Sequence, residues 1–277
     1  MAPRRNDAQL RVITVHNDYL YPLVKRSFTR RLLRRLLSSF DHVVVVSEVI
    51  RRQLEEVVSV PMVVLPAYIE DQSRQVKAQN EVEIFPGDVP TLIVSAYEVD
   101  RMSTETDLYG LDVAAKVYAE MRSHRQLRLG IFIAKEPRSR RDRDYLDKIV
   151  GVAREASDPG EVRSFVGQPL GPVFSESALV YIRPSRTDGD AVSVREALAA
   201  LTPVVASDVV PRPEGVRTAP IGDVAAWVEE IERLLAEPQS FKALSDDYTP
   251  PNLERSNSTE YVELYESWLR EYRNAVA

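Results

Sequence analysis

Short apolar runs that alternate with helical stretches are the feature that most constrains how this chain folds. The runs are rich in Val, Ile and Leu, and they lack the polar residue at every second position that a half-exposed strand shows. Strands of this kind are covered on both faces, as in a parallel sheet with crossover helices. The predicted strands are Val12–His16, His42–Ser47, Met62–Leu65, Thr91–Ala96, Leu127–Ala134, Ala178–Arg183 and Pro203–Ser207.

Segments with a helical period of apolar residues lie between these runs. The predicted helices span about residues 22–39, 47–58, 110–123, 143–156, 192–201 and 223–236, and a last amphipathic helix covers 258–276. The alternation of strand and helix predicts an α/β doubly wound architecture. Residues 67–90 are polar and show no period, and they contain Pro86, Gly87 and Pro90, which is typical of a linker with a surface loop.

We therefore expect four parts along the chain. Residues 1–66 form a short N-terminal segment, and residues 67–90 form the linker. Residues 91–257 form a self-contained C-terminal α/β domain with a Rossmann-like parallel sheet. Residues 258–277 form a helix that packs back toward the N-terminal segment.

Composition excludes several classes of protein. The chain has 277 residues and no Cys, which excludes disulfides, thiolate nucleophiles and Cys-based zinc sites. The N-terminus has no apolar run of the length of a signal peptide, and no window approaches the roughly 18 apolar residues of a membrane-spanning helix. We expect a cytoplasmic protein.

The net charge of −6 conceals an asymmetry along the chain. Residues 1–60 hold 11 of the 36 Lys and Arg residues but only 6 of the 42 Asp and Glu residues. This front segment therefore carries +5, and the remainder carries −11. A basic N-terminal segment on an otherwise acidic protein indicates that this segment binds an anionic partner.

Most of the front's positive charge lies in the predicted helix over residues 22–39. Lys25 and five arginines flank an apolar stripe, and residues 22–39 contain no acid. One interpretation is peripheral contact of residues 25–35 with an anionic membrane surface at the inner membrane face, or with a phosphate-bearing acceptor. The other is a solvated face whose apolar stripe packs on the sheet. Nucleic acid is not expected, because the body is acidic and no aromatic residues interleave the arginines.

The stretch from Tyr181 to Val216 is the part most typical of a functional site. It reads as a buried strand, a polar turn, a helix and a second buried strand. The turn places Asp188, Gly189 and Asp190 just before the helix, and Glu196 lies eight residues after Asp188. Two acids at this spacing can approach one ligand from two sides. They can also be a cap and a surface acid of an ordinary strand–helix unit.

This stretch resembles the donor-site signature of glycosyltransferase family 4, whose members are retaining enzymes of the GT-B fold. In that family, two acids separated by seven residues lie between a strand that ends in Pro-Ser and a helix that continues Glu-Ala-Leu-Ala. A turn, Pro-Val-Val-Ala and Pro-Glu follow. The matching elements here are Pro184–Ser185, Asp188, Glu196–Ala199, Pro203–Ala206 and Pro213–Glu214. The order and spacing together make the match specific.

Earlier segments agree with the resemblance, which extends from about residue 11 onward. DHVVVVSEVIRRQLEE and MVVLPAYIE resemble the family's strand–Ser–helix and interdomain segments. TLIVSAYEV and the helix that follows resemble the start of the donor domain. ITVHN resembles a strand end of the acceptor domain where many members carry a His, which is His16 here. Residues 1–66 would then be the acceptor-side segment and residues 91–257 the nucleotide-sugar donor domain.

The resemblance implies a hexosyltransferase-like function and assigns roles to residues. Asp188 would bind hydroxyls of the transferred sugar, Glu196 would bind the ribose diol, and the amides of Gly189, Asp190, Ala191 and Val192 would hold the diphosphate. His16 would lie near the donor phosphate or sugar. It implies no cofactor and no metal, and the acceptor would be a polysaccharide or a lipid-linked glycan.

The chain departs from the family pattern in three places. The Gly-Arg…Lys-Gly cations after the first donor-domain strand are absent, and Arg101 is the residue available to replace them. The first acid is Asp188 instead of Glu, and Asp190-Ala191 replaces Phe-Gly. The N-terminal segment is shorter than a GT-B acceptor domain. An alternative is therefore a non-catalytic donor-domain remnant, or one half of a split enzyme, completed by a partner subunit or by self-association.

Overall fold

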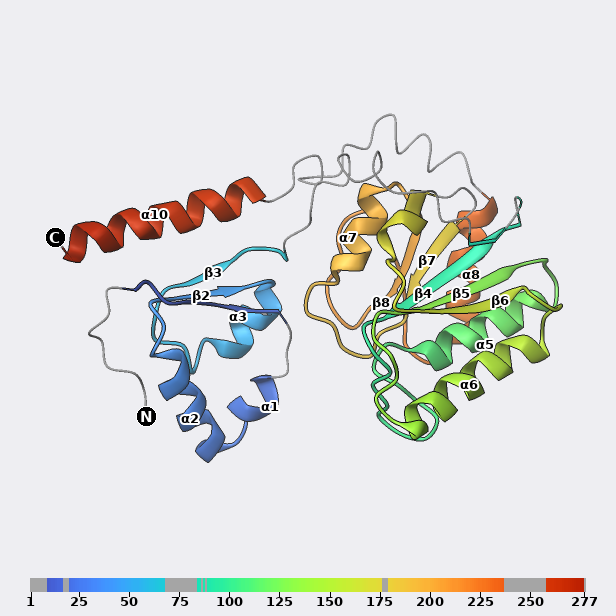
Figure 1. The fold of residues 1–277 in the computed structure, drawn as a ribbon, viewed down its shortest axis with the longest axis horizontal. Coiled ribbons are helices and arrows are strands. Elements are labelled where there is room, and N and C mark those ends of the chain that lie inside the picture. The colour runs from blue at the N-terminus through green and yellow to red at the C-terminus, as the bar shows by residue number, and fades with distance from the viewer. Residues whose placement is uncertain are drawn as a thin grey trace. The chain divides into compact units, whose positions relative to one another are not determined.

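The chain forms two compact units in a computed structural model that describes residues 9–16, 20–67, 84–85, 87, 89–175, 179–236 and 258–276. The first unit combines three stretches of chain, Met1–Glu70, Asp188–Val192 and Arg255–Ala277. The second unit combines Asp71–Thr187 and Ser193–Glu254. Figure 1 shows the helices and strands of both units.

The first unit is built on a parallel sheet of three strands. The strands are β1 (Val12–Val15), β2 (His42–Val45) and β3 (Met62–Val64), with β2 in the middle. Successive valines of β2 point to opposite faces, because side chains alternate along a strand. Val43 and Val45 enter one apolar cluster and Val44 enters another, so both faces of β2 are buried, as the unbroken valine run predicts.

Helices cover both faces of this sheet (Figure 1). On one face lie α1 (Tyr21–Val24), α2 (Ser27–Leu37) and α3 (Glu48–Leu54), which contribute to the cluster around Val43 and Val45. On the other face lies α10 (Ser258–Val276), whose Trp268 is 6% exposed. The Trp268 ring stacks on His42 of β2 with 4.0 Å between ring centroids. The C-terminal helix therefore completes the core of the N-terminal strands.

The second unit contains a parallel sheet of six strands in the order β6-β5-β4-β7-β8-β9. The strands are β4 (Thr91–Ala96), β5 (Arg128–Ile133), β6 (Val162–Val166), β7 (Leu179–Arg183), β8 (Val204–Ser207) and β9 (Arg217–Ala219). The helices are α5 (Leu111–Arg122), α6 (Arg140–Glu155), α7 (Val192–Ala199) and α8 (Val224–Ala236), with a 3-10 turn at Gly171–Ser175. Side chains of α5, α6 and α8 form one large core with one face of the sheet.

The predicted α/β class with a Rossmann-like C-terminal sheet is confirmed. All seven predicted strands are present, and the structure adds the two edge strands of the larger sheet, β6 and the three-residue β9. The prediction of one helix over residues 22–39 is wrong, because the chain breaks at Arg26 into α1 and α2. Arg26 has extended backbone angles (φ −103°, ψ 126°). Helix α6 begins at Arg140 instead of 143, because Ser139 caps it by accepting the Asp142 N–H.

Most of the predicted linker over residues 67–90 lies outside the described residues. Two described residues of this stretch, Ile84 and Phe85, are buried. The Arg163 guanidinium donates to the Ile84 carbonyl at 2.9 Å and lies 5.0 Å from the Phe85 ring centroid. This part of the stretch therefore packs on the outer strand β6 of the second unit.

We expect Trp268→Ala to destabilise the first unit by about 3–5 kcal/mol, the usual loss when a buried aromatic residue is removed. Trp227 is buried in the second unit, and it would then be the only tryptophan of the chain. The midpoint of the urea unfolding transition followed by Trp227 fluorescence should not change, whereas amide hydrogen exchange at Val43–Val45 should become faster. Val262→Ala is the matched control, since Val262 lies on the same helix and is 55% exposed. Unchanged exchange in Trp268→Ala would contradict the role of α10.

Candidate active site

The second unit has a topological switch point between β4 and β7. From these two central strands, the chain proceeds outward through β5 and β6 on one side and through β8 and β9 on the other. Open parallel sheets bind their ligands at such a point, beyond the carboxyl ends of the strands. β7 ends at Arg183, so the predicted Asp188–Glu196 segment begins immediately after it. The sheet therefore places this segment where a ligand is expected.

The turn after β7 is pressed against the start of α5. Gly110 caps α5 with a left-handed backbone (φ +73°), and a Cβ added there would lie 1.9 Å from the Pro184 carbonyl oxygen. The Arg186 N–H donates to the Leu108 carbonyl at 2.8 Å. Only glycine permits this approach, because any side chain would displace Pro184 and the residues that follow.

Buried charges hold the same turn. The Arg186 guanidinium forms a two-bond contact with Asp112, at 2.7 and 2.8 Å, and donates to the Asp107 carbonyl. The Asp107 side chain is fully buried and accepts from the Tyr145 hydroxyl at 2.8 Å and from the Tyr109 N–H. Burial raises the pKa of Asp107, and the hydrogen bond to Asp112 raises the pKa of Arg186.

This network was missed in the sequence analysis. Arg186 and Asp112 are 74 residues apart, so no local pattern joins them. A partial signal was present in Asp107 and Gly110, an acid and a glycine just before a predicted helix, which is typical of a helix start. Arg186 lies two residues before Asp188, so the network fixes the chain that leads into the predicted site.

Glu196 lies on the second turn of α7, as predicted. It is half-buried, and burial raises the pKa of its carboxyl. Within the described residues its carboxylate forms no hydrogen bond and no ion pair. A partly buried carboxylate without a partner is unusual in a folded protein, because burial of an unpaired charge is costly. Its acceptor capacity is available to a ligand.

Three hydroxyl groups join α7 to the sheet. The Tyr181 hydroxyl on β7 is 2.7 Å from the Ser193 hydroxyl on α7 and 2.7 Å from the Ser95 hydroxyl on β4. The Phe174 ring meets the Tyr181 ring edge to face. These contacts hold the first turn of α7, and with it the backbone next to Glu196, against the two strands of the switch point.

Residues Asp188–Val192 are grouped with the first unit. Asp190 accepts the Ala67 N–H at 2.9 Å, and Val192 packs at the margin of the α2 and α3 cluster. The Asp190 carboxylate therefore already accepts a hydrogen bond from a backbone amide of the first unit. Ala191 is buried, whereas Asp188 and Gly189 are partly exposed.

The remaining predicted residues lie on other elements. His16 follows β1 in the first unit and is exposed. Arg101 follows β4 in the second unit, and its Nε donates to Asp142 at 2.9 Å. Hydrogen bonds from Ser139 and then from Arg101 lower the pKa of Asp142. Arg101 is therefore already part of an ion pair, and among the described residues its two Nη groups have no hydrogen-bond acceptor.

Three further cations lie at the carboxyl edge of the six-stranded sheet. Arg183 ends β7, donates to the Ser95 carbonyl and lies over the Tyr109 ring. Lys135 follows β5, 4.5 Å from the Tyr97 ring centroid, and Arg212 follows β8. No local pattern singles these three residues out, because they follow three different strands that only the fold brings to one edge. They give the edge positive charge suited to an anionic ligand.

Comparisons with known proteins agree with this geometry. The sequence profile of the family described as glycosyl transferases group 1 matches residues 99–237, which is half of the chain. No curated protein matches the chain in sequence.

Among solved structures, sucrose-phosphate synthase from Thermosynechococcus elongatus is similar, with 20% identity and a TM-score of 0.67, over 96% of this chain and 68% of that one. α,α-Trehalose 6-phosphate synthase from Burkholderia multivorans has 14% identity and a TM-score of 0.73, over 96% and 66%. The pneumococcal O-GlcNAc transferase GtfA, solved with UDP and GlcNAc, has 15% identity and a TM-score of 0.66, over 94% and 52%.

Two α/β units with parallel sheets, together with these structural neighbours, define a protein of GT-B-like fold. The chain belongs to the glycosyl transferases group 1 family, which is glycosyltransferase family 4. This confirms the resemblance seen in the sequence. The family is one of retaining enzymes that take their sugar from a nucleotide sugar.

We expect Gly110→Ala to lower the free energy of unfolding of the second unit by about 2 kcal/mol or more, from left-handed strain together with overpacking against Pro184. Urea unfolding followed by Trp227 fluorescence measures it. Gly151→Ala is the control, because a Cβ at Gly151 meets nothing within 4 Å. Equal stability of the two variants would contradict the close approach.

We expect Glu196→Gln to stabilise the second unit at neutral pH. Burial raises the folded-state pKa of Glu196 above its ordinary 4.5, so the folded state binds this proton more tightly than the unfolded state does. The wild-type free energy of unfolding therefore falls, relative to the variant, as pH rises above 4.5. The two proteins should be equally stable below that range. A difference in the free energy of unfolding between the two proteins that does not change with pH would contradict burial of the Glu196 carboxylate as the cause.

Proposed function

We propose that this protein transfers a sugar, with retention of configuration, from a nucleoside diphosphate sugar to a hydroxyl group of a polysaccharide or lipid-linked glycan. The observation that carries the proposal is Glu196, a half-buried carboxylate that has no partner among the described residues, next to the switch point of a parallel sheet. A vicinal diol such as that of ribose donates two hydrogen bonds to one carboxylate and so offsets the cost of its burial.

The other residues of the proposed site follow from their place along the same turn. Asp188 binds hydroxyls of the transferred sugar, and the amides of Gly189–Val192 meet the diphosphate where α7 begins. His16 approaches the donor phosphate or sugar. When the bond between the sugar and the phosphate breaks, negative charge develops on the leaving diphosphate. Amides and cations already in position stabilise that charge.

Arg183 is our candidate for the cation that the loop after β4 lacks. It ends β7 at the switch point, and its contact with the Ser95 carbonyl ties its head group to the end of β4. Arg101 is the second candidate through its Nη groups. A guanidinium binds phosphate oxygens through two parallel hydrogen bonds, so either residue has suitable chemistry.

The second candidate function is a non-catalytic donor-domain remnant, or one half of a split enzyme. The missing Gly-Arg…Lys-Gly cations favour it. So does the small sheet of the first unit, in which no described strand pairs with the outer edges of β1 and β3. Such edges accept a strand from a partner subunit or from a second copy of the chain. A remnant or half-enzyme of this kind would bind nucleotide, or a partner, without turnover.

A lipid-linked acceptor would bring the protein to a membrane, and the proposal includes contact of residues 25–35 with its anionic surface. None of the described helices is long and apolar enough to cross a bilayer. We propose a peripheral contact, with the protein in the cytoplasm at the inner membrane face.

Calorimetric titration with UDP, GDP, ADP and their common sugar conjugates tests donor binding. We expect micromolar affinity for one nucleotide, and a loss of at least tenfold in Glu196→Gln, since two hydrogen bonds to a charged acceptor are weakened. Affinity should also fall as pH drops into the raised titration range of Glu196, and this acid limb should be absent from the variant. Glu155→Gln is the matched control, because Glu155 is an exposed acid of α6.

Two comparisons separate the candidate functions. If Arg183 binds the diphosphate, Arg183→Gln should lower the affinity for the nucleoside diphosphate and leave the affinity for the nucleoside unchanged. Slow hydrolysis of the bound sugar nucleotide, lost in Glu196→Gln, indicates an enzyme, whereas tight binding without turnover indicates the remnant. Wild-type protein that binds none of the nucleotides overturns the donor site altogether.

A further inference from the structure

Helix α2 carries two apolar rows, and only one of them faces the core. Leu33 and Leu37 are buried against the three-stranded sheet. Phe28, Leu32 and Leu36 are 82%, 62% and 54% exposed. These three residues are four positions apart, so they form one continuous row on the helix surface. Single exposed apolar residues are ordinary, but a row of three on one helix is typical of an interaction surface.

The arginines of α2 also fall into two groups. Arg30 forms an ion pair with Glu56 at 3.2 Å, and Arg34 donates to the Glu56 carbonyl at 2.6 Å. These two bind α2 to the end of α3. Arg31 and Arg35 have no hydrogen bond or ion pair within the described residues, and both are exposed. Their charge is therefore available to an outside partner.

Helical geometry places the available arginines beside the exposed apolar row. With 3.6 residues per turn, Arg35 lies next to Phe28 in projection and Arg31 lies one step further round. Arg30 and Arg34 lie between Arg31 and the buried row. The segment Ser27–Leu37 contains no acidic residue. One side of α2 thus combines an apolar row with adjoining positive charge, which is the pattern of a helix that lies in a membrane interface.

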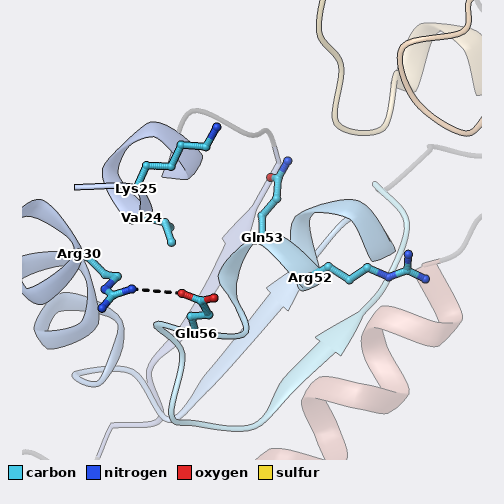
Figure 2. A pocket seen from close by; sticks show the side chains of 6 residues that line it. All are labelled: Val24, Lys25, Arg30, Arg52, Gln53 and Glu56. Carbon is cyan, nitrogen blue, oxygen red and sulfur yellow. Dashed lines mark hydrogen bonds and ion pairs between the residues drawn. The ribbon is translucent and has the colours of Figure 1, made fainter. Parts of the chain in front are cut away.

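A pocket of about 380 Å³ near the other side of α2 does not share this character. It is lined by Val24, Lys25, Arg30, Arg52, Gln53 and Glu56. Figure 2 shows the Arg30–Glu56 pair within it, while Arg52 extends away from that pair. The single acid offsets one of the three cations that line the pocket. Val24 is its only apolar lining residue among those described, so the combination of an exposed apolar row with cationic side chains occurs beside Phe28, Leu32 and Leu36.

We propose that α2 lies in the surface of a membrane that contains anionic lipid, with Phe28, Leu32 and Leu36 among the acyl chains and Arg31 and Arg35 at the headgroup phosphates. Arginine suits this place because its stem remains in the apolar layer while the guanidinium reaches the phosphates. The inference deepens the membrane contact included in the proposed function, and it does not depend on donor binding. Charge complementarity selects an anionic bilayer over a neutral one.

Sedimentation with vesicles tests the proposal, with phosphatidylcholine alone and with phosphatidylcholine containing phosphatidylglycerol. The wild type should prefer the anionic vesicles at least tenfold, and this preference should shrink as salt increases. Phe28→Ser with Leu32→Ser should lower binding at least tenfold. Arg31→Gln with Arg35→Gln should lower binding to anionic vesicles about 30-fold at low salt, since each cation contributes a factor of about five.

Arg141→Gln with Arg143→Gln is the matched control, because it removes the same charge from exposed positions of α6. Unchanged binding in this control supports the proposal, and a loss equal to that of the α2 pair overturns it in favour of a general charge effect. Equal binding of the wild type to neutral and anionic vesicles also overturns it. So does a dimer, detected by light scattering, that Phe28→Ser with Leu32→Ser abolishes, because the row would then be an interface between copies.

Nucleotide titration of the same variants separates this inference from the proposed donor site. The α2 variants should keep the wild-type nucleotide affinity. Vesicle binding by a protein that binds no nucleotide would overturn the donor site and leave the membrane contact in place. Nucleotide binding without vesicle binding would overturn the membrane contact and leave the donor site in place.

Discussion

The ion pair between Arg186 and Asp112 is the interaction on which the candidate site most depends. Two buried acids, Asp107 and Asp112, lie where α5 begins, and the guanidinium pairs with the Asp112 carboxylate and donates to the Asp107 backbone carbonyl. Removing one partner of such a group usually costs 3–5 kcal/mol, because the remaining charge stays buried and unpaired. The same guanidinium belongs to the turn that leads to Asp188. Stability of the second unit and placement of the site therefore rest on one side chain.

Local features of the chain predicted seven of the nine strands that the structure describes and indicated the candidate site, because apolar runs and the Asp188–Glu196 spacing are contiguous in sequence. The Arg186 network escaped prediction because its partners are 74 residues apart and only the fold brings them together. The division of the α2 leucines into a buried row and an exposed row was not predicted, for another reason. Helical periodicity shows that leucines share a side, but it does not say whether Leu33 or Leu32 faces the sheet. The break at Arg26 left no signal in composition.

Function accounts for features that stability alone would disfavour. Glu196 is half-buried with no partner in the part of the chain that the structure describes, and Phe28, Leu32 and Leu36 are exposed to water. Both arrangements cost free energy in the isolated chain, and both become favourable once a diol or a lipid surface supplies what is missing. In our proposal, Glu196 of the second unit binds the donor together with Asp188–Val192 of the first unit, and α2 of the first unit contacts the membrane.

The first unit is assembled from distant parts of the chain, and this has a consequence for its synthesis. Its three strands precede the second unit in the chain, whereas α10, which covers the face containing Val44 and Leu65, follows it. The ribosome therefore synthesises the whole second unit between these strands and α10. The apolar face of β2 remains uncovered until α10 has been synthesised, which exposes it to chaperones. The second unit, with local strand–helix contacts, completes its folding before the first does.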